Sequence, residues 1–118
     1  MITPASNVQA ITTVSQTQSL AIENFMQGAI YTWSKNFPKK AFAVRDLVGG
    51  ENYDWHGTPL IALYDAHKQL GESDVDAVSH AAQDLGWIVK KVLTNDKRNY
   101  VNTKQDKVNY YKWVGNEP

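Results

Sequence analysis

The 118-residue chain contains no cysteine, which excludes disulfide bridges and thiolate metal sites and is typical of a reducing compartment. It also has no apolar run of eighteen residues, so we expect no membrane-spanning segment and no membrane partner. The N-terminal segment lacks the basic start and compact apolar core of a signal peptide. Formal net charge is zero, because 12 basic residues balance 12 acidic ones. These absences together predict a cytoplasmic protein.

The residues that are present predict one globular domain. Hydrophobic residues make up 42% of the chain and charged residues 20%, which is ordinary for a protein with a single core. Residues 1–18 are rich in Ser, Thr, Gln and Asn and show no sustained period, so we expect a flexible N-terminal arm there. Residues 19–118 then form the domain.

Apolar spacing predicts three helices and a short helical turn. A helical face begins near Ser19 and stops at Pro38; it carries Ile22, Phe25, Met26, Ala29, Ile30 and Trp33. A helical turn at residues 44–48 ends at Gly49. Thr58 caps a helix that closes at Gly71, and Ser73 caps another that closes at Gly86. The three-residue turn at 71–73 gives the outline of a helix-turn-helix motif.

The period changes after Gly86. Residues 87–94 are rich in branched and aromatic side chains, which predicts a strand, and Asn95 and Asp96 predict a turn. Residues 100–102 and 108–114 predict two more strands. The fold class is therefore α+β, with three to four helices followed by a C-terminal antiparallel β-hairpin or three-stranded meander.

Two segments resemble a known family. Residues 82–92, with Leu85-Gly86-Trp87 before a basic stretch, and residues 95–101, with Arg98 and Tyr100, are similar to the ending of winged-helix domains in phage and mobile-element replication proteins. The C-terminal part of virulence-associated primase-helicases is one such domain. Residues 42–49 are similar to the short strand and helix that open those motifs. The resemblance implies a winged-helix-like fold and DNA binding, with a β-wing that touches phosphates.

The chain departs from this pattern in two ways. The segment from Glu51 to Leu70 is longer than usual, and the expected recognition helix carries Asp74, Asp76 and Asp84. Acidic groups repel phosphates, so a basic wing must make most DNA contacts, aided by Lys39, Lys40 and Arg45. Residues 87–118 suit this role, since they carry seven basic and three acidic side chains. The predicted nucleic-acid-binding residues are Lys90, Lys91, Lys97, Arg98, Tyr100, Lys104 and Lys107. Lysines at a hairpin edge can equally serve only to prevent edge pairing.

No constellation for catalysis or metal binding appears in the sequence. The three histidines, His56, His67 and His80, show no pair at the i, i+4 spacing of a metal-binding helix. Asp54 beside His56 resembles an ordinary surface pair, and His67 lies on the apolar face of its helix, where a hydrogen-bonded core histidine is expected. Gly49-Gly50 lacks the Lys-Ser/Thr of a phosphate loop. We therefore predict a non-enzymatic protein with no cofactor and no metal site.

A protein-interaction role is the alternative. Residues 41–86 carry two basic and eight acidic side chains, and an aromatic loop interrupts them. The acidic face and this loop predict a partner or homodimer surface, as in a small adaptor or inhibitor protein. The loop residues concerned are Tyr53, Asp54, Trp55 and His56. Salt dependence of binding separates this hypothesis from DNA binding.

Overall fold

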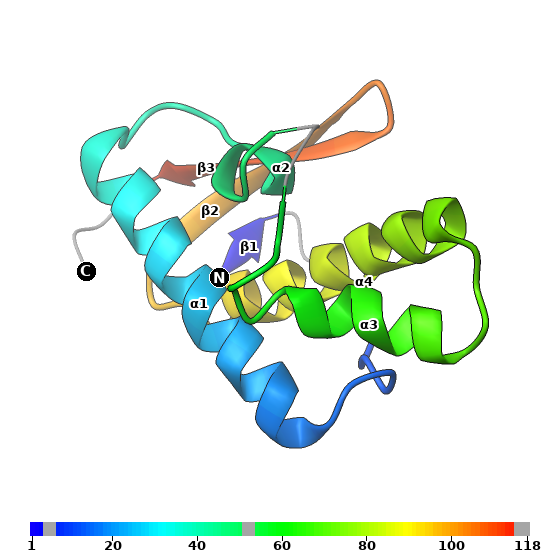
Figure 1. The fold of residues 1–118 in the computed structure, drawn as a ribbon. Coiled ribbons are helices and arrows are strands. Elements are labelled where there is room, and N and C mark those ends of the chain that lie inside the picture. The colour runs from blue at the N-terminus through cyan, green and yellow to red at the C-terminus, as the bar shows by residue number, and fades with distance from the viewer. Residues whose placement is uncertain (4–6, 51–53, 115–118) are drawn as a thin grey trace.

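The structure is a computed structural model that describes residues 1–3, 7–50 and 54–114. Among these residues it has four helices and a three-stranded sheet, so the predicted α+β class is confirmed. Figure 1 shows α1 crossing in front of the C-terminal end of α4, α3 lying beside α4, and the sheet above these helices in this view. None of the described helices is long and apolar enough to cross a membrane.

Helix α1 spans Gln16–Asn36 and begins at a capping box. Ser15 Oγ accepts a hydrogen bond from the Gln18 backbone N–H at 3.1 Å, and Gln18 Oε1 accepts one from the Ser15 N–H at 2.9 Å. Ile22, Met26 and Ile30 are fully buried, as the apolar spacing predicted. The helix ends just before Pro38, where it was expected to end.

Helix α2 lies where it was predicted, but α3 begins later than predicted: its N-cap is Leu60, not Thr58. Helix α2 spans Val44–Leu47, and Gly49 and Gly50 end it with φ values of 106° and 86°. Helix α3 spans Ile61–Gln69, after a turn in which Thr58 Oγ1 accepts from the Leu60 N–H at 3.2 Å. The turn into the following helix contains Gly71, whose φ is 88°.

Helix α4 spans Asp74–Asn95 and is much longer than predicted. Ser73 caps it, as expected, by accepting from the Asp76 N–H. The predicted end at Gly86 and the predicted strand at residues 87–94 are both wrong. Leu85, Ile88, Val89 and Val92 lie at i, i+3, i+4 and i+7 and are all buried, so burial of one helical face overrides the β propensity of the segment.

The sheet has the order β1-β2-β3. Strands β2 (Asn99–Gln105) and β3 (Val108–Val114) form the predicted antiparallel hairpin, closed by a two-residue loop. Strand β1 (Ile2–Thr3) pairs in parallel with β2. Phe42 forms a single bridge to Tyr111 on the other edge, with N···O distances of 2.8 Å in both directions. Elements far apart in sequence thus flank the hairpin on both sides.

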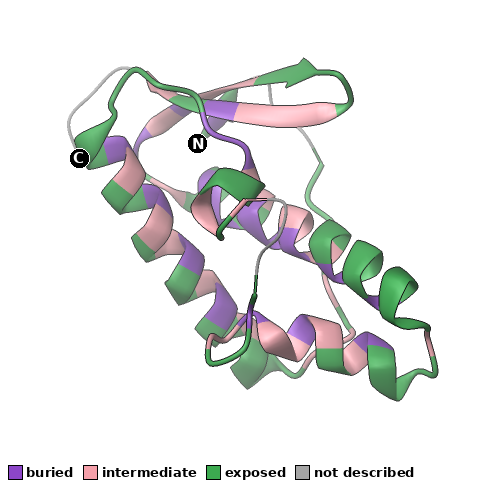
Figure 2. Ribbon diagram, turned by 45° about the horizontal axis from the view of Figure 1, so that its top comes forward, coloured by how far each residue is buried: buried purple, intermediate pink, exposed green. Residues whose placement is uncertain are grey.

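The core lies between α1, α3, α4 and one face of the sheet. Figure 2 shows buried residues on the inward sides of these helices and exposed residues at the hairpin tip and at the outer end of α3 and α4. Phe42, Tyr100 and Tyr111 are fully buried, and the centre of the Phe42 ring lies 5.9 Å from that of Tyr111 and 6.4 Å from that of Tyr100. Trp113 packs against this core from β3.

The N-terminal segment differs from the predicted flexible arm of residues 1–18. Residues 2–3 belong to the sheet, residues 16–18 belong to α1, and Ile2 is 5% exposed. Ile11 and Val14 also pack against the core. The predicted boundary at residue 18 is therefore not where the folded part of the chain begins.

Candidate nucleic-acid interface

The side of α4 that faces away from the core carries small and polar residues. Ser79, Gln83, Gly86 and Lys90 follow one another at steps of four, three and four, so they lie along one stripe of the helix. Because the opposite stripe is apolar and buried, the packing of α4 fixes the direction of this one. The stripe turns toward the β2–β3 hairpin, with which it borders a groove.

The groove between α4, α2 and the hairpin has a volume of about 700 Å³. Its described lining includes three basic side chains and no Asp or Glu. Arg45 comes from α2, Lys90 from α4 and Lys107 from the hairpin loop. The lining also includes the hydrogen-bonding side chains of Ser79, Gln83 and Asn109. The small residues Ala82 and Gly86 leave room for a ligand to approach the helix closely. An anionic, hydrogen-bonding ligand suits this lining.

Three of the predicted basic residues lie on this side of the fold or extend from it. Lys90 and Lys107 line the groove, and Lys104 is exposed near the hairpin tip. The Lys90 ammonium lies 4.7 Å from the centre of the Trp87 ring, and this cation–π contact holds the lysine along the helix. Lys91 instead pairs with Glu23 on α1 at 3.0 Å. Lys97 is exposed in the turn before β2, outside the groove lining.

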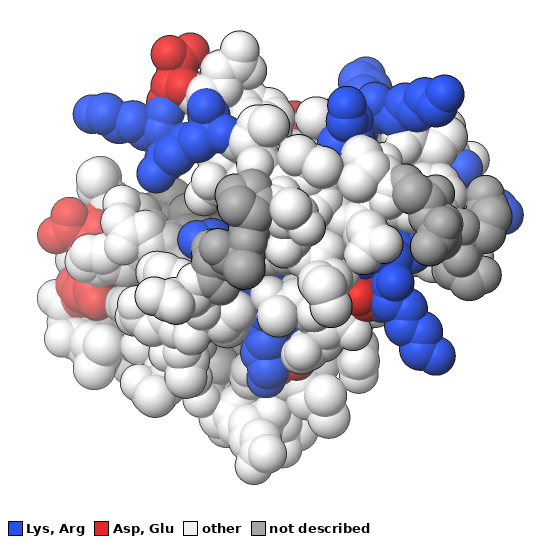
Figure 3. Space-filling model, turned by 180° about the vertical axis from the view of Figure 1, so that it is seen from behind, with Lys and Arg blue, Asp and Glu red and all other residues white. Residues whose placement is uncertain are grey.

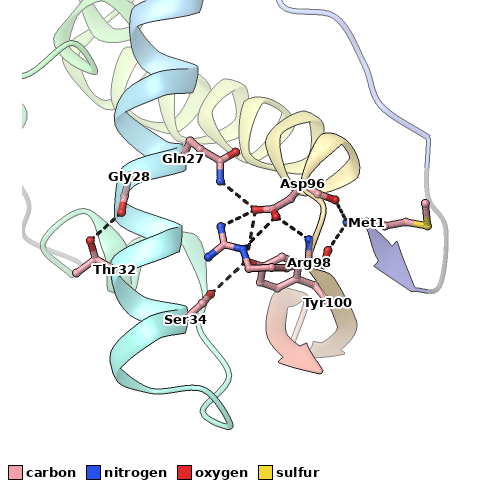
Figure 4. A network of polar contacts seen from close by, with 8 residues as sticks. All are labelled: Met1, Gln27, Gly28, Thr32, Ser34, Asp96, Arg98 and Tyr100. Carbon is pink, nitrogen blue, oxygen red and sulfur yellow. Dashed lines mark hydrogen bonds and ion pairs between the residues drawn. The ribbon is translucent and has the colours of Figure 1, made fainter. Parts of the chain in front are cut away.

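Two predicted binding residues are buried, contrary to expectation. Arg98 is 5% exposed and Tyr100 is fully buried, so neither is offered to a nucleic acid. Figure 4 shows the reason: Arg98 turns inward and meets the Asp96 carboxylate, with Nη2 2.7 Å from Oδ2 and Nε 3.0 Å from Oδ1. The guanidinium also lies 4.7 Å from the Tyr31 ring centre. A double variant Lys97→Ala/Arg98→Ala would therefore remove a buried ion pair as well as an exposed lysine. Such a variant could not test DNA binding by the wing alone.

The Asp96 carboxylate is the centre of this network. It accepts hydrogen bonds from the Arg98 backbone, the Arg98 side chain and Gln27 Nε2, the last at 2.9 Å. Burial favours the protonated acid, but these hydrogen bonds outweigh it and lower the pKa of Asp96 from 3.8 to about 2. Gln27 lies on α1 and Asp96 at the end of α4, so the network joins the two long helices to the hairpin.

The outer end of α3 and α4 is acidic. Asp74 and Asp76 lie in the first turn of α4, where negative charge meets the helix dipole. Asp74 also pairs with Lys68 at 2.7 Å and accepts a hydrogen bond from Tyr64 at 2.9 Å. Figure 3 shows acidic side chains over the α3–α4 end, and basic side chains at the hairpin tip, where acidic atoms also lie, and over the parts of this face away from the α3–α4 end. Acidic and basic surfaces are thus separated along the molecule.

The loop predicted as a partner surface is only partly available. Trp55 is 6% exposed and belongs to the core, so it is not an interface anchor. Asp54 and His56 are exposed and pair with each other, with Nδ1 2.7 Å from Oδ1. The His56 backbone and side chain both bond to this carboxylate, which lowers the pKa of Asp54. Tyr53 lies outside the described residues.

A second cluster of polar groups links α3 to α4. His67 is buried, with Nδ1 2.6 Å from Glu72 Oε2 and Nε2 2.8 Å from Asp84 Oδ2, which confirms the hydrogen-bonded core histidine predicted there. Burial alone would lower the pKa of His67, but the carboxylates of Asp84 and Glu72 raise it. His80 Nδ1 meets the other oxygen of Glu72, and the two imidazoles lower the pKa of that carboxyl.

Sequence reasoning missed both the polar stripe and the convergence of His67, Glu72 and His80. The stripe could have been found by continuing the helical period past Gly86. The histidine cluster gives no local signal, because its members lie on both sides of a turn. No family model, curated protein or solved structure matches this chain.

Proposed function

We propose that this chain is a non-enzymatic, winged-helix-like module that binds duplex DNA through the groove between α4 and the hairpin. The element order supports the fold assignment: α1, the Phe42 bridge, α2, α3, a short turn, α4 and a hairpin follow the winged-helix layout. The observation that carries the function is the groove lining, with three basic side chains and no acidic one among the residues described. A phage or mobile-element setting follows from the sequence resemblance alone.

In this proposal phosphates lie along the hairpin side of the groove. Lys107 and Lys104 reach the backbone from the wing, and Arg45 and Lys90 reach it from α2 and α4. Ser79 and Gln83 supply hydrogen bonds to sugar, phosphate or base edges. The acidic end of α4 faces away from DNA, since Asp74 and Asp76 would repel it. Affinity therefore comes from the part of α4 beyond its acidic first turn, unlike in proteins that insert the N-terminal end of this helix.

Fluorescence anisotropy of a labelled duplex tests the proposal. We expect binding that weakens with salt, with a slope of log K against log salt of about −3.6 for four phosphate contacts. The double variant Lys90→Ala/Lys107→Ala should flatten the slope by about 2. Lys35→Ala is the matched control, because Lys35 is exposed on α1 outside the groove lining. An equal effect of control and double variant would refute a groove-specific interface.

One observation favours protein binding at the opposite end. Leu70, Val75 and Val78 are exposed by 69%, 79% and 43%, and they lie among the acidic residues of the α3–α4 end. Exposed apolar side chains within a charged rim are typical of protein contacts. If the duplex does not bind even at low salt, this acidic end becomes the first candidate surface, facing a basic partner.

A further inference from the structure

Three nitrogen and oxygen donors converge where α3 turns into α4. His67 comes from the last part of α3, Glu72 from the turn and His80 from the second turn of α4. One donor atom of each lies within 4.8 Å of the others. The Glu72 carboxylate lies between the imidazoles, with one oxygen toward each Nδ1. The convergence requires the fold, because the residues are five and eight positions apart in the chain.

We propose that His67, Glu72 and His80 bind one zinc-class divalent ion. Two imidazole nitrogens and one carboxylate oxygen form a donor set that suits Zn²⁺, whereas Mg²⁺ and Ca²⁺ prefer oxygen donors alone. Three protein ligands leave the fourth tetrahedral position to a water molecule. The ion joins α3, the turn and α4, a role separate from the DNA groove.

The surroundings of His67 match the outer shell of a metal site. With Nδ1 directed at the ion, Nε2 carries the proton and donates it to Asp84 Oδ2 at 2.8 Å. Asp84 is held in turn by Thr13, whose hydroxyl donates to the same oxygen at 3.0 Å. A carboxylate behind a ligating histidine fixes the ring orientation and strengthens the ligand. Glu72 and Asp84 together supply the two negative charges that balance a divalent ion.

The solvent exposure and the donor spacing of the three ligand residues also fit a zinc site. The His67 side chain is 9% exposed, Glu72 21% and His80 48%, so the cluster is rigid on the α3 side and open to solvent on the α4 side. Tetrahedral zinc with bonds near 2.0–2.1 Å separates its donor atoms by about 3.3 Å. The 2.6 Å between His67 Nδ1 and Glu72 Oε2 must therefore widen slightly, which the partly exposed side chains of Glu72 and His80 allow.

Zinc titration of the full chain tests the site. After treatment with EDTA and buffer exchange, calorimetry with Zn²⁺ alone should show one ion per chain. His80→Gln should weaken zinc binding at least about 10-fold, and Asp84→Asn, a change to a positioning residue, should weaken it about 10- to 100-fold. His56→Gln is the matched control, since this histidine is 80% exposed and pairs only with Asp54 among the interactions described. It should leave the affinity unchanged.

A second readout separates a zinc site from a bridge between protonated imidazoles. Zinc should raise the Tm of the unaltered chain by several degrees, EDTA should reverse the rise, and His80→Gln should abolish it. Circular dichroism verifies that each variant is folded, and Glu72→Gln replaces His80→Gln if the latter is not. Absent zinc binding, or equal binding by the control and by the ligand variants, would overturn the proposal and leave Glu72 as a purely electrostatic bridge.

Discussion

Asp96 and Arg98 carry the most consequential buried charges of the described chain. Their side chains are 5% and 4% exposed, so each depends on the other to offset the loss of water. The pair is further hydrogen-bonded to Gln27 and covered by Tyr31 and Tyr100. Such an arrangement adds little stability relative to an apolar core, but breaking half of it is costly.

Asp96→Asn should therefore destabilise the protein by about 3 kcal/mol, because it leaves the Arg98 guanidinium buried without a counter-charge. Urea denaturation followed by circular dichroism at pH 7 measures the change. Asp65→Asn, at an exposed position on α3, is the control and should stay within about 0.5 kcal/mol of the parent. A loss for Asp96→Asn no larger than that of the control would contradict a buried pair.

The same pair should make stability fall in acid. The pKa of Asp96 is about 2 in the folded chain against an ordinary 3.8, so the unfolded chain binds the proton more tightly. Its contribution is complete above about pH 5 and decreases as the pH falls toward 2, by about 2 kcal/mol. Urea denaturation of the parent and of Asp96→Asn at each pH gives the difference between their free energies of unfolding, and this difference should shrink by that amount as the pH falls. A difference that stays the same at every pH would show that the Asp96 carboxylate titrates normally.

Individual basic residues could be predicted only in part. Lys90, Lys104 and Lys107 are accessible on one side, as expected from a basic C-terminal third. Arg98 was expected beside Lys97 in an exposed turn, but a single turn can direct neighbouring side chains inward and outward. The Arg98 side chain turns inward because Asp96, Tyr31 and Tyr100 lie close together in the folded chain, and no local sequence pattern reveals this proximity.

At the scale of elements, burial decides where α4 ends. The apolar periods of α1, α2 and α3 were predictable because propensity and burial agree in them, whereas the Ser15 cap of α1 was not predicted and the predicted Thr58 cap of α3 is wrong. In residues 87–94 they disagree: the side chains favour a strand, but Ile88, Val89, Val92 and Leu93 bury one helical face. Gly86 resembled a helix stop, yet it lies inside the helix and is not among the glycines with positive φ.

Gly86→Ala should stabilise the protein by about 0.5–1 kcal/mol. An added Cβ would meet no atom within 4 Å, and alanine is the better residue inside a helix. Gly71→Ala has equally open surroundings but a φ of 88°, so it should destabilise instead. Thermal unfolding of both variants measures the change in stability, which should be a gain for Gly86→Ala and a loss for Gly71→Ala. Destabilisation by Gly86→Ala would indicate that the helix stops there, as the sequence alone suggested.

The hairpin loop holds two non-glycine residues in the left-handed region. Asp106 has φ 51° and Lys107 has φ 66°, as a two-residue type I′ turn requires. Lys107→Gly removes this strain and should stabilise the hairpin by about 0.5 kcal/mol. The same change removes a groove cation, so DNA affinity should fall while Tm rises. Lys104→Gly, inside β2, should lower both. Unchanged affinity in Lys107→Gly would remove this lysine from the interface.

At the scale of the molecule, segments distant in sequence complete the sheet and separate the charges. The acidic α3–α4 end and the basic groove lie on different parts of the surface although the formal net charge is zero (Figure 3). The charge runs in the sequence predicted this separation. Strand β1 was not predictable, because two residues show no period and only pairing with β2 makes them a strand.

Ile2 should therefore be a core residue of the whole fold. It is 5% exposed and lies opposite Tyr100, whose backbone N–H donates to the Met1 carbonyl at 2.8 Å. Ile2→Ala should cost about 2 kcal/mol and speed hydrogen exchange at the Tyr100 amide. Val8→Ala, at a position 39% exposed, is the control and should change neither quantity by much. If residues 1–3 instead moved freely, both variants would unfold at the same urea concentration, and the Tyr100 amide would exchange at one rate in both.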